Sequence, residues 1–440
     1  MNYESFLLIF YSNIPLFIIT WIITVSLYFL IFKRYIFSVI DPLFYHTFVS
    51  SSGFSIIFSL WYLGYIDNYY LYNFLITQAF FILGFYVFKP IKIRKIQNSM
   101  HNLNPVNITI FAKTLYLISG LIFIITNYAL YVLKGIPLLM ESRLEAGSGG
   151  YGIFIATLST TTAIMLAFIF LKIFVLKKKI NFIDFFFLAN ILIHTILSGS
   201  RSGILNFLFI SFYILLFIKV KRQIDIFSKL KFKFVFLISF AILLSLFLFY
   251  LTTKQNPLFS LIFRILMTGD IYIMAYVNDN INLIEGDFLS HFIGPILAGF
   301  KIISWNEVPK SIGQQLFDYI YQTDLVAGPN ARMNIIALKF FGEFSFLYSF
   351  IVGLVISFIR NKSIYLIKDN ILGLLIYLFL SLPVLSLETD IFYAIFLYKT
   401  YFTIGLFLIL ISVIISDSFK SGGKHNGKNE SLWHNSYLQS

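Results

Sequence analysis

The 440-residue sequence contains no cysteine and carries little charge. Without cysteine, the protein has no disulfide, no thiolate zinc site and no cysteine nucleophile. Charged residues make up 12% of the chain, about half of the roughly 25% in a typical soluble domain. In contrast, 59% of the residues are hydrophobic and 20% are aromatic, including 54 phenylalanines. This composition indicates a protein surrounded largely by lipid.

Several short motifs of enzymes are missing as well. The sequence has no Walker-type phosphate loop and no Gly-x-Gly-x-x-Gly fingerprint. Metal-ligand spacing is absent among His46, His101, His194 and His291. We therefore predict no metal and no other cofactor. The formal net charge of +13 does not indicate a nucleic-acid partner, because the basic residues lie mainly between apolar segments and not on one soluble face.

Long apolar runs fill most of the chain, and a membrane-spanning helix needs about 20 such residues. The candidate spans are 6–32, 43–65, 73–88, 111–133, 153–176, 181–197, 203–219, 234–252, 344–359, 371–387 and 400–416. The predicted fold class is all-α, a polytopic integral membrane bundle of about 11 or 12 transmembrane helices over residues 1–416. The polar tail at 417–440 is expected to be disordered and cytoplasmic.

Most of the 33 basic residues fall in one set of alternate loops, which the positive-inside rule places in the cytoplasm. The long segment 252–343 then faces outward, together with the N-terminus and the loops at 134–152, 198–202 and 388–399. Arginine binds phosphate oxygens bidentately, so arginines in these outward segments are candidates for binding an anion.

Two of these arginines lie in short loops. Arg143 stands between Glu141 and Glu145 and precedes a glycine run, which allows close backbone approach to a ligand. A flexible turn is the alternative. Arg201 lies in the sequence Ser-Gly-Ser-Arg-Ser-Gly at 198–203, at the start of a helix whose free amides favour an anion. Here the alternative is an arginine that reaches to the membrane surface.

The long outward segment supplies further charged residues. Residues 258–277 are apolar except for Arg264 and Asp270, and we interpret them as an amphipathic or partly re-entrant helix along the membrane surface. Arg332 follows later, and Glu343 begins the next apolar run. Glu343 is either a cap that complements the helix dipole or a functional carboxylate.

Two acidic pairs receive structural interpretations. Glu388 and Asp390 are expected to solvate an outward turn. Glu285-Gly286-Asp287 resembles the acidic metal-binding pair of some glycosyltransferases, but we predict a turn because three residues make a weak pattern. We find neither an internal repeat nor a matching pair of broken helices, which argues against an inverted-repeat transporter.

The chain resembles a bacterial O-antigen polymerase, the Wzy-type polymerase of oligosaccharide repeat units. The sequences that carry the resemblance are Ile-Pro-Leu-Leu at 136–139, Arg-Leu-Glu-Ala-Gly at 143–147, Gly-Ser-Arg-Ser-Gly at 199–203 and Phe-Gly-Glu-Phe at 341–344. The order of many spans, arginine-bearing outward loops and a large late periplasmic loop is also similar.

The resemblance implies a GT-C-like, metal-independent glycosyltransferase, multi-pass in the bacterial inner membrane. Its donor and acceptor would be undecaprenyl-diphosphate-linked oligosaccharides within membrane lipid, and a chain-length regulator protein would be a partner. The diphosphate-binding residues would be Arg143, Arg201, Arg264 and Arg332. The candidates for the catalytic base are Glu343, Asp270 and Glu141.

Two other functions remain open from the sequence. An O-antigen ligase uses the same carrier and usually shows a loop histidine, which here could only be His291. A repeat-unit flippase is a transporter and should carry charges within its spans, whereas the outward charges here are expected mainly in loops.

Overall fold

The structure is a computed structural model that describes residues 1–91, 110–140, 152–198, 201–222, 224, 265–323 and 327–434. Within these ranges every regular element is helical. The helices of the first half are α1 (Tyr3–Ser12), α2 (Ile14–Phe32), α3 (Pro42–Tyr62), α4 (Asn68–Tyr86), α5 (Ile110–Lys134), α6 (Gly152–Phe170), α7 (Phe182–Leu197) and α8 (Arg201–Arg222). Those of the second half are α11 (Asp270–Tyr276), α12 (Phe288–Gly299), α13 (Ile312–Tyr321), α14 (Met333–Phe341), α15 (Ser345–Asn361), α16 (Ser363–Leu366), α17 (Ile371–Ser381), α18 (Ser386–Thr389) and α19 (Ile391–His434).

Seven stretches of the described chain are long and apolar enough to cross a membrane, which confirms a polytopic helical membrane protein. They are Ile14–Phe32, Pro42–Tyr62, Ile110–Leu139, Gly152–Val175, Met333–Asn361, Ile371–Thr389 and Ile391–Asp417. Each overlaps a span predicted from the sequence. The predicted spans at 73–88, 181–197 and 203–219 form the helices α4, α7 and α8, which are not among the seven. The span at 234–252 lies outside the described residues.

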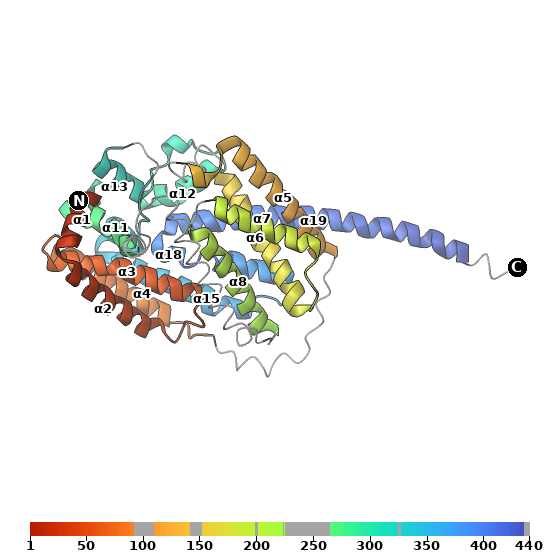
Figure 1. The fold of residues 1–440 in the computed structure, drawn as a ribbon, viewed down its shortest axis with the longest axis horizontal. Coiled ribbons are helices and arrows are strands. Elements are labelled where there is room, and N and C mark those ends of the chain that lie inside the picture. Colours follow the sequence, from red (N-terminus) through yellow and green to blue (C-terminus); the bar gives the residue numbers. More distant parts are fainter. Residues whose placement is uncertain are drawn as a thin grey trace.

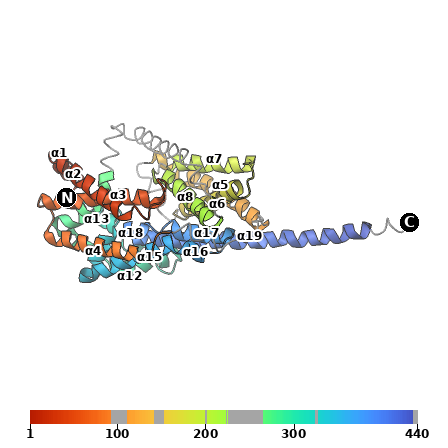
Figure 2. The same cartoon turned by 90° about the horizontal axis from the view of Figure 1, so that it is seen from below.

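The helices pack around two hydrophobic cores. The first core joins α1 to α4 with α11, α13 to α15, α18 and the start of α19. The second joins α5 to α8 with α16, α17 and the following part of α19. Figure 1 shows α2, α3 and α4 at one end of the molecule, and α5 to α8 lie nearer to the long α19. The view in Figure 2 keeps the same separation.

A buried ion pair lies where the two cores meet. Arg360, at the end of α15, places Nη2 2.8 and 2.6 Å from the two carboxylate oxygens of Asp41. Asp41 also caps α3, because its side chain accepts a hydrogen bond from the backbone N–H of Leu43. Tyr213 of α8 and Tyr377 of α17, both in the second core, lie near this guanidinium. This pair therefore links the α2–α3 connection, α15 and both cores.

Two glycines allow α4 and α15 to cross at close range. A Cβ atom on Gly353 would lie 2.1 Å from the carbonyl oxygen of Phe81, and one on Gly84 would lie 2.1 Å from that of Phe350. Small residues at helix crossings let backbones approach in membrane proteins, where close packing drives association.

We expect Gly353→Ala to destabilise this crossing by about 1–3 kcal/mol, because the added methyl group meets backbone that cannot rotate away. The measurement is thermal unfolding of the purified protein in detergent. Gly294→Ala is the matched control, since its nearest neighbour would be a Val308 methyl group at 3.4 Å. Equal unfolding temperatures for the two variants would contradict the prediction.

The long segment 252–343 contains short helices in its described part and differs from the surface helix that we expected at 258–277. The 3-10 turn Met267–Gly269 leads into α11, where residues 271–276 are all at most 6% exposed. The expectation of an amphipathic helix along the membrane surface is therefore wrong for residues 271–276, which are all buried. The partly re-entrant alternative stays a prediction, and residues 258–264 lie outside the described residues. A Cβ on Gly269 would lie 2.2 Å from the carbonyl oxygen of Gly53, so the turn rests directly on α3.

Two connections are fixed by side-chain caps, and the carboxyl-terminal tail differs from the expectation. Glu285 to Asp287 form the expected turn, with Gly286 at φ +87° and Asp287 capping α12. The predicted outward loop at 388–399 is helical from Ile391, because Asp390 accepts hydrogen bonds from the backbone of Phe392 and Tyr393. The structure continues α19 to His434, although we expected disorder from residue 417.

Candidate functional site

Several helix ends meet inside the first core. The backbone N–H of Arg332, the residue before α14, donates a hydrogen bond of 2.7 Å to the carbonyl oxygen of Thr389 at the end of α18. Arg332 has φ +52°, a conformation that non-glycine residues rarely adopt and that persists only where the surroundings fix it. Strain of this kind concentrates at functional sites.

The side chain of Arg332 is held by contacts from α3 and from the turn Met267–Gly269. It is 3% exposed, with Nη1 2.8 Å from Ser50 Oγ on α3 and Nη2 2.9 Å from the carbonyl oxygen of Thr268. The ring of Phe54 lies 5.7 Å from the guanidinium carbon. Thr268 belongs to the turn that Gly269 seats on α3, so the close backbone approach also positions this acceptor. The result is a cation fixed in a low-dielectric interior.

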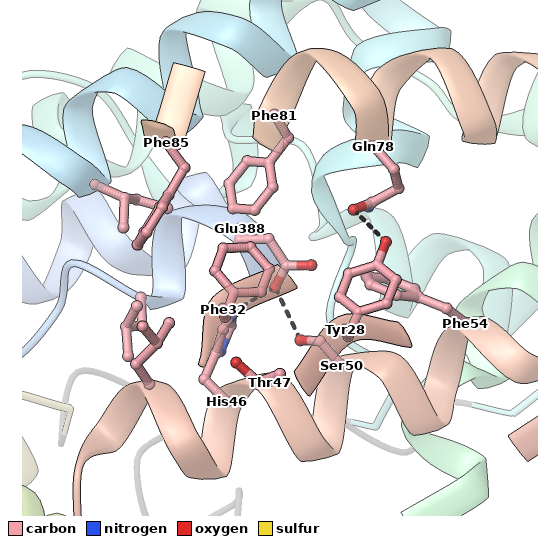
Figure 3. A pocket seen from close by; sticks show the side chains of 13 residues that line it. Tyr28, Phe32, His46, Thr47, Ser50, Phe54, Gln78, Phe81, Phe85 and Glu388 are labelled. Carbon is pink, nitrogen blue, oxygen red and sulfur yellow. Dashed lines mark hydrogen bonds and ion pairs between the residues drawn. The ribbon is translucent and has the colours of Figure 1, made fainter. Parts of the chain in front are cut away.

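Glu388 of α18 faces this cation and is itself 2% exposed. Its Oε2 lies 2.8 Å from His46 Nε2, accepts a 3.0 Å hydrogen bond from Ser50 and is 3.5 Å from Arg332 Nη1. Figure 3 shows the second carboxylate oxygen pointing away from His46 and Ser50. We refer to Arg332, Ser50, Glu388 and His46 as the charged cluster.

This arrangement corrects the interpretation of Glu388 and Asp390 as residues that solvate a turn. Both are buried, at 2% and 8% exposure. Charged groups are costly in an apolar interior unless they are paired or hydrogen-bonded, and the partners of Glu388 and the helix cap made by Asp390 meet that requirement.

A cavity of about 20 Å³ adjoins the charged cluster, which is room for about one water molecule. His46, Ser50 and Glu388 line one side of it, and Tyr28 and Gln78 line another (Figure 3). The Tyr28 hydroxyl donates a 2.8 Å hydrogen bond to Gln78 Oε1. Gln78 in turn donates to Asn334 Oδ1 at 3.0 Å, which joins α2, α4 and α14 in one buried polar network.

Of the predicted site residues whose side chains the structure describes, Arg332 lies in the charged cluster, whereas Asp270 and Glu343 do not belong to it. Glu141, Arg143 and Arg264 lie outside the described residues. Arg201 begins α8, as expected, but its side chain also lies outside them. The convergence of the four arginines on one anion therefore stays a prediction.

The two remaining candidate bases occupy different surroundings. Asp270 is the first residue of α11, next to the turn that binds Arg332, and its Oδ1 accepts a hydrogen bond from the backbone of Ile271. Glu343 is exposed in the 3-10 turn Gly342–Phe344, which precedes α15. Its position fits the helix-dipole interpretation.

His46, Ser50 and Glu388 were not predicted as site residues, since His46 was considered only as a metal ligand and Glu388 only as a residue that solvates a turn. A signal was present, because His46 and Ser50 are four residues apart on one face of a predicted span. An ionisable residue inside a span usually marks a functional site and has a partner. Among the described residues, no group of three or more His, Asp or Glu side chains could hold a metal ion.

Comparisons of the chain with models of known protein families, with curated proteins and with solved structures found no match. The charged cluster, the cavity beside it and the membrane-spanning helices around it are therefore the basis for a functional proposal.

Proposed function

We propose that the protein is a membrane glycosyltransferase that joins diphosphate-linked oligosaccharide repeat units, an O-antigen-type polymerase with GT-C-like architecture. It would act at the outer face of the bacterial inner membrane, on undecaprenyl diphosphate carriers, with segment 252–343 as its periplasmic loop. The observation that carries this proposal is the fixed Arg332 guanidinium beside the Glu388 carboxylate and the His46 imidazole, buried among apolar helices.

The chemistry of polymerisation matches these groups. The bond between the sugar carbon and the diphosphate breaks, the acceptor hydroxyl forms the new glycosidic bond, and the carrier diphosphate leaves with the bonding electrons. A preorganised cation at low dielectric stabilises the charge that develops on this leaving group. The hydroxyl proton goes to a carboxylate acting as general base, for which Glu343, Asp270 and Glu141 remain candidates. The diphosphate bond supplies the driving force, so no nucleotide is required.

The charged cluster must open to admit a substrate, since its cavity holds about one water molecule. The contact between Arg332 and Glu388 is the longest in the cluster, at 3.5 Å. A diphosphate oxygen can replace Glu388 at this position without breaking the hydrogen bond between His46 and Glu388. Ion exchange at Arg332 is therefore the expected first step of binding.

One observation supports a transporter, the flippase, as second candidate. Arg332, Glu388 and His46 all lie within or directly beside membrane-spanning stretches, and α14 and α18 have ends next to them. Broken helices with internal charges are typical of transport proteins. A ligase receives less support, because its expected loop histidine, His291, has a structural role. Burial lowers the pKa of His291, and its Nε2 donates a hydrogen bond to the carbonyl oxygen of Glu285. This histidine holds the turn before α12.

The lipopolysaccharide of a deletion strain separates these functions. We expect loss of a polymerase to leave core capped by a single repeat unit, which migrates as one band on a gel. Loss of a flippase would leave no capped core, and loss of a ligase would leave bare core with accumulated lipid-linked polymer. Either of these two patterns would replace the polymerase proposal, and a normal ladder would exclude all three functions.

A further inference from the structure

An apolar groove of about 400 Å³ runs along α2 and α4. Its lining includes Ile23, Leu27 and Tyr28 of α2 and Leu75, Gln78 and Ala79 of α4. The lining extends over the helical residues 20–31, a length of roughly 16 Å at 1.5 Å per residue. The volume lies in the range of small-molecule pockets.

The outer rim of the groove faces the membrane interior. Ile23 and Leu27 are 60% and 53% exposed, and both lie on the candidate span Ile14–Phe32. Isoleucine and leucine side chains exposed on such a helix contact lipid hydrocarbon. A molecule can therefore enter the groove sideways from the bilayer without crossing water.

The floor of the groove separates it from the charged cluster. Tyr28 and Gln78 line both the groove and the small cavity that Glu388 also lines. Their hydrogen bond of 2.8 Å is the partition between the two spaces. A hydrocarbon chain in the groove thus lies on one side of this side-chain pair, and the Arg332 and Glu388 charges lie on the other.

We propose that this groove binds the isoprenoid chain of the lipid carrier. The inference rests on the proposed function, which gives Arg332 to the diphosphate of the same molecule. Once the charged cluster opens and the Tyr28–Gln78 hydrogen bond breaks, one amphiphile spans both spaces, with its chain between α2 and α4 and its anionic headgroup at the charged cluster. Thr20 and Thr24 do not disturb an apolar chain, since their hydroxyls donate to carbonyl oxygens of their own helix.

The test uses the full chain purified in detergent, with undecaprenyl phosphate as probe and native mass spectrometry as readout. Ala79→Trp fills the groove and is expected to weaken binding of the probe at least tenfold. Ile76→Trp is the control, because Ile76 is 48% exposed on α4 but does not line the groove. It should stay within twofold of the unsubstituted protein. Leu75→Trp, which also lines the groove, replaces Ala79→Trp if the latter does not reach the membrane.

Three results would overturn parts of the scheme. If Ala79→Trp and Leu75→Trp bind the probe as tightly as Ile76→Trp, the groove is not the chain site. If phosphatidylglycerol displaces the probe as effectively as unlabelled undecaprenyl phosphate does, the groove is not selective for an isoprenoid chain. If the probe binds in the groove but the protein forms no polymer from lipid-linked repeat units, the groove assignment stands and the proposed function fails.

Discussion

Arg332→Lys should reduce polymer formation by about 10²–10³-fold, the size of effect found when one fixed charge-stabilising donor is removed from an active site. Lysine keeps the positive charge that Glu388 requires, but an ammonium group cannot reproduce the planar contacts to Ser50 and to the Thr268 carbonyl. The measurement is the rate of polymer formation by purified protein with lipid-linked repeat units. Protein amount in the membrane should stay within twofold of the unsubstituted level.

Arg222→Lys is the matched control for this experiment. Arg222 pairs with Asp369 at 2.8 Å, and both side chains retain some exposure at 10% and 19%. The same change in chemistry away from the charged cluster should leave polymer formation unaltered. Equal activities of Arg332→Lys and Arg222→Lys would remove Arg332 from the proposed site.

Asp41→Ala should destabilise the fold strongly, by more than the glycine substitution at the α4–α15 crossing does. Arg360 is 1% exposed and would keep its charge without its carboxylate partner, and breaking a buried pair in this way costs about 3–5 kcal/mol. Unfolding in mixed detergent micelles measures the loss. Replacing both residues, as Asp41→Asn with Arg360→Met, should recover part of it because no unpaired charge remains.

The exposed pair Lys310–Asp318 provides the comparison for Asp41. Its side chains are 59% and 20% exposed and approach to 2.7 Å, and surface pairs contribute about 0–1 kcal/mol. Lys310→Met should therefore change the unfolding curve little. If Asp41→Ala were equally mild, the junction between the two cores would not depend on this ion pair.

The helical class and most span positions could be predicted, because an apolar run of sufficient length specifies a membrane helix directly. The span predicted at 43–65 is α3, which starts at Pro42 after the Asp41 cap. Predictions failed where a side chain ends or begins a helix. Asn13 divides the predicted span 6–32 into α1 and α2, and Asp390 starts α19 nine residues before the predicted position 400.

The charged cluster was harder to predict than the helices. Arg332 was recognised as a candidate, but its partners lie on α3 and α18, and Ser50 is 338 residues away from Glu388 in the sequence. Pairings of that separation depend on how the helices pack, which no local pattern specifies. The positive φ at Arg332 has no local signal either, since that conformation is imposed by the contact with Thr389.

The separation between Ser50 and Glu388 has a consequence for biosynthesis. At typical translation rates, the ribosome needs roughly tens of seconds to advance the 338 positions from Ser50 to Glu388. During this time α3 carries His46 and Ser50 into the bilayer without their acidic partner, and later Arg332 arrives still lacking its counter-ion. The amino-terminal helices can settle into their final packing only after α18 has been inserted, so a nascent chain that stops before it would be a substrate for membrane quality control.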